Sequence, residues 1–385
     1  MIGKKILIVF PYAHLAYSPT VLNLCRMLLE RGHFVRVVYG IEKVWGGQTP
    51  AIAGVEFDQT SYSDGTMKFV RRADKYLWGP FSRMMRATTF SKLYPRLTLR
   101  GWMLYRMMSK GLDSTPVDEV IVVDVLSLYW ASRKKVDCHF VSLEVDDYLP
   151  LMKRLDISKI KSVVTQTRER YDRLFAGLDI RCFFVQNAPK FVHPKKRSTA
   201  SANLIYNGSA WAPFGALDLI GFVKAYPGYK LHFKGNVHRE VLKIAESECG
   251  ELVRSGSLTF SDTYIGENAL REYLSDYSIG FCLYDFNNPD IAKRRFNYET
   301  APSGKVYMYL SVGLPVIATN IRGFKFIEDA RAGVLLNDHR PESLKNAVDL
   351  ILNDYKTFSD NALMTGQKFS FDKAAKTFID FVTNG

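Results

Sequence analysis

The sequence predicts an α/β protein with two doubly wound parallel-sheet domains, and three observations support this class. An apolar segment at residues 4–10 is followed by a stripe of apolar side chains at helical spacing in residues 20–31 and by a second apolar segment, FVRVVYG. This strand–helix–strand order is typical of a parallel sheet. Residues 203–338 repeat the alternation of short apolar strands and amphipathic helices. A chain of 385 residues is long enough for two such domains.

Breaker residues divide the predicted series in two. Segment 186–200 is polar and contains Pro189 and Pro194, so we expect the linker there. The first domain is expected at residues 1–190 and the second at 200–365. Residues 366–385 read as a final helix with apolar side chains on one face.

The formal net charge of +13 is concentrated in one segment, residues 68–110, which has eleven basic side chains and one acid. The same segment is rich in aromatic residues and methionine. Basic and aromatic side chains together suit an anionic membrane surface, which we expect as a partner. Two alternatives are a nucleic-acid surface and an ordinary pair of helices with solvated basic faces.

Cysteine usage and hydropathy indicate the cellular compartment and whether the chain spans a membrane. The five cysteines are scattered without a C-x-x-C pair, so we expect reduced core thiols and neither a disulfide framework nor a structural metal. No run of about 18 uncharged apolar residues occurs, so no transmembrane helix is expected. The N-terminus lacks a small-residue cleavage site and enters a strand–loop–helix pattern directly, so we expect it to be the first core strand rather than a signal peptide. The reduced cysteines predict a cytoplasmic protein.

The segment SGKVYMYLSVGLPVIATN carries the clearest chemistry. Ser303, Gly304 and Lys305 stand where a helix begins, followed by a glycine turn and the apolar strand LPVIAT. A helix N-terminus offers free amides and a positive dipole end, and Lys305 adds a full charge. The pattern predicts an anion site at this helix start.

Two further strand ends carry glycine. Gly208 and Ser209 follow the strand NLIYN, and Lys234 ends the strand KLHFK before Gly235. A glycine at a strand end allows a ligand to approach the backbone closely. Lys234 is expected either to point at such a ligand or to be solvated.

These segments together resemble GT-B glycosyltransferases. Their sugar-nucleotide segment usually reads as a helix ending in EYLAAGKPVVAS, and the opening ERGHFVRVVYG is also similar to theirs. The resemblance covers the whole chain and is stronger after Asn203. It implies the GT-B fold, two Rossmann-like domains facing an interdomain cleft, with the final helix 366–385 crossing back to the N-terminal domain.

The resemblance implies a nucleotide-diphosphate sugar as donor, UDP-sugar above others, with no cofactor and no metal. Because no convincing D-x-D motif is present, cations and helix amides are expected to stabilise the leaving diphosphate. The residues expected at the donor are Gly208, Ser209, Lys234, Arg295, Tyr298, Ser303, Gly304 and Lys305.

Catalytic candidates lie in the first domain. The segment SLEVDD ends a predicted buried strand, so Glu144 or Asp146 is the candidate base for an acceptor hydroxyl. His14, in the first strand–helix loop, is a second polar candidate. Met308 stands where many retaining members carry a glutamate, which leaves retaining and inverting chemistry both open.

The function implied is a hexosyltransferase acting on a lipid-linked or glycan acceptor, of the type found in bacterial surface-polysaccharide biosynthesis. Such an enzyme would be peripheral on the inner face of the membrane. One alternative is a sugar-nucleotide epimerase of the same fold. The other is a nucleic-acid-binding protein that uses segment 68–110, although no nucleic-acid motif accompanies the charge and none is expected as a partner.

Overall fold

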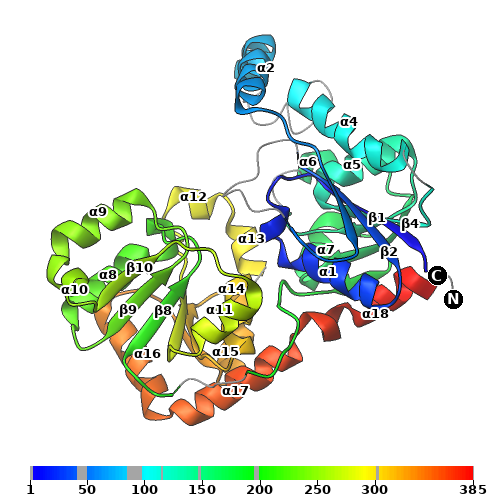
Figure 1. The fold of residues 1–385 in the computed structure, drawn as a ribbon. Coiled ribbons are helices and arrows are strands. Elements are labelled where there is room, and N and C mark those ends of the chain that lie inside the picture. Colours follow the sequence, from blue (N-terminus) through cyan, green and yellow to red (C-terminus); the bar gives the residue numbers. More distant parts are fainter. Residues whose placement is uncertain are drawn as a thin grey trace. The chain divides into compact units, whose positions relative to one another are not determined.

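The computed structural model describes residues 3–40, 50–84, 98–113, 116–145, 149–194, 199–300 and 303–384. The chain divides into two compact units (Figure 1). Unit 1 comprises Met1–Val185 and Ala374–Gly385, and unit 2 comprises Gln186–Lys373. The division falls at the start of segment 186–200.

Unit 1 contains a seven-stranded sheet in the order β3-β2-β1-β4-β5-β6-β7, with every neighbouring pair parallel. Its strands are β1 (Lys5–Phe10), β2 (Phe34–Tyr39), β3 (Val55–Gln59), β4 (Glu119–Val123), β5 (Cys138–Val141), β6 (Ile160–Thr165) and β7 (Cys182–Phe184). The chain extends from β1 to β3 on one side and from β4 to β7 on the other. The topological switch point, where open α/β sheets bind ligands, therefore lies between β1 and β4.

Helices connect these parallel strands, as right-handed crossovers require. They are η1 (Leu15–Tyr17), α1 (Pro19–Glu30), α2 (Asp64–Met84), α4 (Leu99–Asp113), α5 (Asp124–Lys134), α6 (Leu149–Met152) and α7 (Arg168–Phe175). The final helix, α18 (Phe371–Asn384), packs on this unit through Phe378, whose ring lies 5.8 Å from that of His139 and 5.5 Å from that of Phe183. Lys4 Nζ donates to the Val382 carbonyl at 3.0 Å.

Unit 2 contains a six-stranded parallel sheet in the order β10-β9-β8-β11-β12-β13. Its strands are β8 (Asn203–Asn207), β9 (Lys230–Lys234), β10 (Leu258–Ser261), β11 (Ile279–Cys282), β12 (Val316–Thr319) and β13 (Gly333–Leu336). The chain again extends in both directions from the centre, so the switch point lies between β8 and β11. Both sheets are doubly wound, which confirms the predicted fold class.

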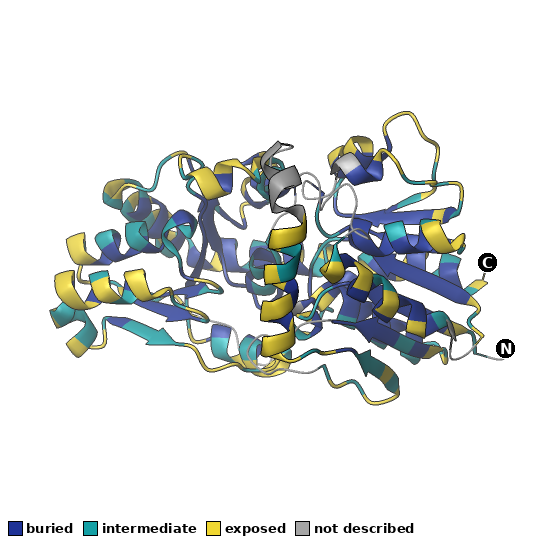
Figure 2. Cartoon of the chain, turned by 90° about the horizontal axis from the view of Figure 1, so that it is seen from above, coloured by how far each residue is buried: buried dark blue, intermediate teal, exposed yellow. Residues whose placement is uncertain are grey.

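The inner strands of unit 2, β8, β9, β11 and β12, are buried along most of their length, as a parallel sheet needs, whereas the edge strand β10 is partly exposed (Figure 2). Leu204 and Tyr206 of β8 pack in one apolar cluster and Ile205 in the other, because alternate strand residues face opposite sides. The helices of this unit are η4 (Ala212–Phe214), α8 (Ala216–Ala225), α9 (Arg239–Glu248), α10 (Gly250–Arg254), α11 (Glu267–Leu274), α12 (Pro289–Ala292), α13 (Arg295–Thr300), α14 (Gly304–Ser311), η5 (Arg322–Phe324), α15 (Lys325–Asp329), α16 (Pro341–Asn353) and α17 (Tyr355–Lys368).

In the residue ranges that the structure describes, no helix combines the length and apolar character needed to cross a bilayer. The same ranges contain no group of three or more His, Cys, Asp or Glu side chains placed to hold a metal ion. All five cysteines are free thiols, and four of them are buried.

Candidate active site

A glycine turn and a lysine meet at the switch point of unit 2. Gly208 follows β8 with a φ of 122°, a conformation that favours glycine, and its amide donates to the Lys234 carbonyl at 2.8 Å. A Cβ atom at Gly208 would lie 3.3 Å from Nζ of Lys305, the second residue of α14. The absence of a side chain at position 208 therefore lets the ammonium lie directly against the backbone of the turn.

Tyr206 fixes the ammonium in this place. Lys305 Nζ donates to the Tyr206 hydroxyl at 2.9 Å and lies 4.1 Å from the centroid of its ring. The hydroxyl in turn donates to the carbonyl of Ser209 at 2.9 Å. Because Tyr206 is completely buried, this chain connects the start of α14 rigidly to the turn at Gly208 and Ser209.

The charge of Lys305 has no carboxylate partner among the residues that the structure describes. Burial lowers the pKa of the Lys305 ammonium, while Cys282 and Tyr298 act in the opposite direction. A cation that is held in a partly buried place without a counter-ion favours a bound anion.

The start of α14 also offers backbone amides. Ser303 is the N-cap residue, and its side chain does not cap the helix. A Cβ at Gly304 would lie 2.9 Å from Asn187 Nδ2 and 3.1 Å from the Asn187 carbonyl oxygen, so only glycine fits there without a shift. Ser303, Gly304 and Lys305 thus occupy the helix start that the sequence predicts, near the carboxyl ends of β8 and β11.

Lys234 contributes to this turn through its backbone rather than through its ammonium. The side chain is only 4% exposed, and Nζ donates to Ser261 Oγ at 3.0 Å and to the Thr263 carbonyl. The neighbouring Gly235 has a φ of 122°, and a Cβ there would lie 2.5 Å from the carbonyl oxygen of Gly208. The two glycine turns are therefore in close contact, while the Lys234 ammonium is held at the end of β10.

The two residues expected in α13 differ in their surroundings. Arg295 is exposed, its Nε donates to Glu299 Oε1 at 2.7 Å, and its guanidinium lies 5.1 Å from the ring centroid of Phe286. Tyr298 is half-buried, with its ring 4.8 Å from that of Tyr284. Tyr298 belongs to the group around Lys305, whereas the charge of Arg295 is balanced by Glu299.

In unit 1, the described candidates lie at the carboxyl end of the sheet. His14, after β1, is exposed and stacks on Tyr12 with ring centroids 5.2 Å apart. Glu144 follows β5, and its backbone amide donates a hydrogen bond to Asp124 Oδ1 at 3.0 Å. Asp146 lies outside the described residues.

Asp124 lies beside Glu144 and is not among the residues predicted from the sequence. It directly follows β4, is 2% exposed, and has a φ of 59°. Burial raises the pKa of its carboxyl group to about 7; the Leu143 and Glu144 amides and the Tyr12 hydroxyl lower it, while the charge of Glu144 raises it. The signal available in the sequence was an aspartate placed immediately after the continuous apolar run VIVV.

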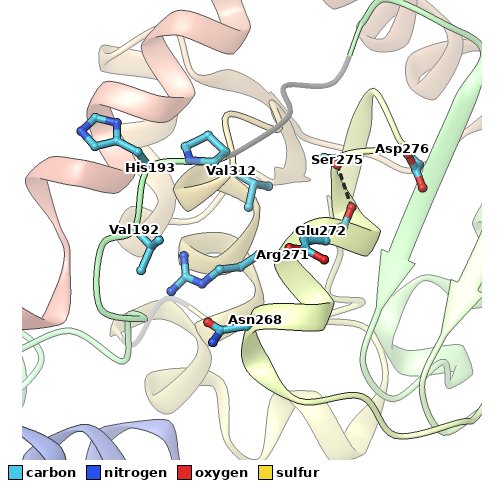
Figure 3. Close-up of a pocket in the computed structure, with 9 residues that line it drawn as sticks. Val192, His193, Asn268, Arg271, Glu272, Ser275, Asp276 and Val312 are labelled. Atoms are coloured by element: carbon cyan, nitrogen blue, oxygen red, sulfur yellow. Dashed lines mark hydrogen bonds between the residues drawn. The ribbon is translucent and has the colours of Figure 1, made fainter.

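A separate pocket of about 480 Å³ lies along α11 (Figure 3). Arg271 reaches into its wall and donates to Ser311 Oγ at 3.1 Å and to the Lys190 carbonyl at 2.5 Å. Ser275, Asp276 and Val312 line the pocket and come just before β11 and β12. The pocket therefore lies toward the amino ends of these strands, whereas the Lys305 group lies at the carboxyl ends.

Comparison with known proteins relates this chain to one fold. No family model and no curated protein matches the sequence. Among solved structures, sucrose-phosphate synthase from Thermosynechococcus elongatus matches with a TM-score of 0.67 and 14% identity over 98% of both chains. A structure described as trehalose-6-phosphate from E. coli bound with UDP-2-fluoro glucose matches with a TM-score of 0.64 and 11% identity, also over 98% of both chains.

A third match is AviGT4, a glycosyltransferase involved in avilamycin A biosynthesis, with a TM-score of 0.57 and 14% identity over 98% of this chain and 96% of that one. These matches have one architecture in common, the GT-B fold of two Rossmann-like domains. The chain therefore has the GT-B fold, as the sequence predicts.

Proposed function

We propose that this protein is a glycosyltransferase that moves a hexosyl group from a nucleotide-diphosphate sugar to an acceptor hydroxyl. The observation that carries the proposal is the Lys305 ammonium, which lies against the Gly208 turn at the switch point of unit 2. The fold supports it, because solved structures of the same fold are glycosyltransferases.

The donor diphosphate is proposed to lie between the start of α14 and the Gly208–Ser209 turn. When the acceptor oxygen bonds to the anomeric carbon, the bond to the diphosphate oxygen breaks and its electron pair goes to the diphosphate. The leaving group gains negative charge in this step. Lys305 and the amides at the start of α14 are placed to stabilise that charge, which is the role we assign to them in place of a metal ion.

The nucleotide of the donor is proposed to be uridine diphosphate (UDP). Two matched solved structures name it in their descriptions: one is bound with UDP-2-fluoro glucose, and the other is S. aureus TarM in complex with UDP. A test is to measure which nucleotide sugars raise the melting temperature, because a ligand that binds the native state stabilises it. UDP-sugars should raise it and free sugars should not, and a set of nucleotide sugars without any effect would contradict the proposal.

The acceptor is proposed to be lipid-linked, which would make the protein peripheral on a membrane. Helix α2 carries exposed aromatic rings, with Phe69 66% exposed and Tyr76 82% exposed. Lys68 and Arg72 are exposed on the same helix. Rings inserted at the headgroup level and cations near anionic lipids are the two contributions that hold an interfacial helix.

The single acid of segment 68–110, Asp74, is engaged within the protein. Asp74 accepts hydrogen bonds from the amides of Leu99 at 2.7 Å and Arg100 at 3.2 Å, so its carboxylate caps the start of α4. On α4, the Arg106 guanidinium lies 5.5 Å from the ring centroid of the exposed Trp102. Helices α2 and α4 lie near each other in unit 1 (Figure 1). Both carry exposed basic and aromatic side chains.

The proposed activity is tested by incubating the protein with UDP-[14C]hexoses and a lipid extract, followed by chromatography of the products. Transfer of label to the lipid fraction is expected. A labelled product that remains a nucleotide sugar with altered sugar would indicate an epimerase instead. If labelled free sugar is the only product, the proposed lipid acceptor is wrong, although binding of the donor is supported.

A further inference from the structure

A pair of carboxyl groups occupies the switch point of unit 1. Asp124 follows β4 and Glu144 follows β5, and these strands are neighbours in the sheet. Tyr12 follows β1, on the other side of β4. Three adjacent strands therefore deliver polar side chains to the place where a doubly wound sheet binds its ligand.

Asp124 holds the backbone of the turn that carries Glu144. Its Oδ1 atom accepts hydrogen bonds from the amides of Leu143 at 2.7 Å and Glu144 at 3.0 Å. Its Oδ2 atom is also shielded from solvent. A side chain that is buried in this way cannot reach a substrate directly, so any effect on a reaction must pass through the groups that it holds.

The conformation of Asp124 is unusual for an ordinary side chain. Its φ of 59° lies in the left-handed region, which aspartate and asparagine tolerate better than most residues. Such strained positions cluster at functional sites, where the surrounding structure maintains them. Here the strain places the carboxylate under the two amides of the neighbouring turn.

The turn is also held from its other side. Arg170, in α7, is 1% exposed, and its Nη1 atom donates to the carbonyl of Leu143 at 2.8 Å. One peptide segment is thus held by the Asp124 carboxyl group at its amides and by the Arg170 guanidinium at its carbonyl. The hydrogen bond from the guanidinium is charge-assisted and therefore stronger than a neutral one.

We propose that Asp124 is a positioning residue that fixes the turn at Leu143 and Glu144 and so directs the Glu144 carboxylate at the acceptor hydroxyl. This inference rests on the proposed function for the identity of the ligand. Where the reaction inverts the anomeric carbon, the acceptor proton passes to Glu144 as the acceptor oxygen attacks. The groups that face Asp124 are Tyr12 from the β1 loop and Glu144 from the β5 turn.

Two substitutions separate the contributions of Asp124. Asp124→Asn keeps an oxygen that accepts from both amides and tolerates the left-handed backbone, whereas Asp124→Gly tolerates the backbone but removes the acceptor. We expect Asp124→Gly to lower kcat by roughly 10²-fold without changing donor affinity. Asp124→Asn should restore kcat to within about tenfold of the natural protein.

Val125→Ala is the matched control, because Val125 is buried in the same helix and makes no hydrogen bond with its side chain. It should lower the melting temperature about as much as Asp124→Gly while leaving kcat unchanged. In addition, the double variant Glu144→Gln with Asp124→Gly should have the same kcat as Glu144→Gln alone, because both changes remove the same function. Additive losses in the double variant would overturn the proposal.

A second measurement does not depend on activity. Backbone amide signals of Leu143 and Glu144 should shift between pH 5 and 9 as Asp124 titrates, and the shift should vanish in Asp124→Asn. If the natural protein transfers no sugar but these amides titrate, the proposed function fails while the link from Asp124 to the Glu144 turn stands. If transfer occurs and the amides do not follow Asp124, the positioning role is overturned alone.

Discussion

The ammonium of Lys305 and the phenol of Tyr206 form one unit, with Nζ 2.9 Å from the hydroxyl and 4.1 Å from the ring centroid. The two residues are 99 positions apart in the sequence. Their contact connects the helix start of α14 with the turn after β8. We therefore expect substitution of Lys305 to lower turnover and substitution of Tyr206 to weaken donor binding.

Lys305→Ala should remove transfer while the fold survives. The variant deletes the cation that stabilises the leaving diphosphate, so kcat should fall by roughly 10²–10³-fold. The Tyr206 hydroxyl still donates to Ser209, so the turn remains supported and the melting temperature should change little. Steady-state kinetics and thermal melting check this, and a variant with normal turnover and normal donor affinity would exclude Lys305 from the site.

Tyr206→Phe should weaken donor binding without destroying it. The substitution keeps the buried ring under the ammonium but removes the hydroxyl that joins Lys305 to Ser209. Hydrogen bonds to charged groups contribute about 1.5–3 kcal/mol, so donor affinity should fall by roughly 10–100-fold. Isothermal titration with the preferred nucleotide sugar gives this value, and an unchanged Kd would show that Lys305 is positioned without Tyr206.

Gly235→Ala should damage the same site through the backbone. A Cβ at position 235 would lie 2.5 Å from the Gly208 carbonyl oxygen, and its φ of 122° is unfavourable for alanine. We expect a loss of more than about 1 kcal/mol in the free energy of unfolding together with weaker donor binding. Gly221→Ala is the control, since a Cβ there would contact nothing within 4 Å. Equal stability of the two variants would contradict the close packing of the glycine turns.

The sequence predicted the fold well because its signals are local. Apolar runs, helical spacing and the segment from Ser303 to Asn320 correctly indicated α14 and β12. Val306 and Leu310 of α14 are inaccessible to solvent, as expected of a helix that packs on a parallel sheet.

The details of the site depend on contacts between strands, which local signals do not contain. Asp124 was missed because its partners, Leu143 and Glu144, come from a neighbouring strand 19 and 20 residues away. The direction of the Lys234 ammonium follows from its contact with Ser261 of β10, which strand register alone decides. The roles of Ser303 and Lys305 remain predictions, and the Lys305→Ala variant tests that of Lys305.

The pKa of Asp124 predicts how stability changes with pH. Its folded-state pKa of about 7 lies above the ordinary value of 3.8, so the folded protein holds this proton more tightly than the unfolded chain does. The resulting stability is fully present below about pH 4 and is lost as the pH rises through about 7. The natural protein should therefore lose melting temperature relative to Asp124→Asn between pH 5 and 8, by on the order of 5 °C. A difference that is constant over this range would show that Asp124 titrates normally.

Binding to membranes should follow the charges and rings of α2. Vesicles that contain anionic phosphatidylglycerol should bind the protein, and added salt should weaken binding because it screens the charges. Lys68→Glu with Arg72→Glu should reduce binding by roughly tenfold or more, since each base near the surface contributes about 1 kcal/mol. Arg239→Glu with Lys243→Glu, on exposed positions of α9 in unit 2, changes the net charge equally with the same spacing and should have little effect.

Phe69→Ser with Tyr76→Ser should weaken binding even at high salt, because the rings act through burial rather than charge. Equal binding to neutral phosphatidylcholine vesicles, or equal losses in the two charge-reversed variants, would show that α2 is not the membrane surface, and salt-sensitive binding to nucleic acid alone would assign segment 68–110 to that partner instead.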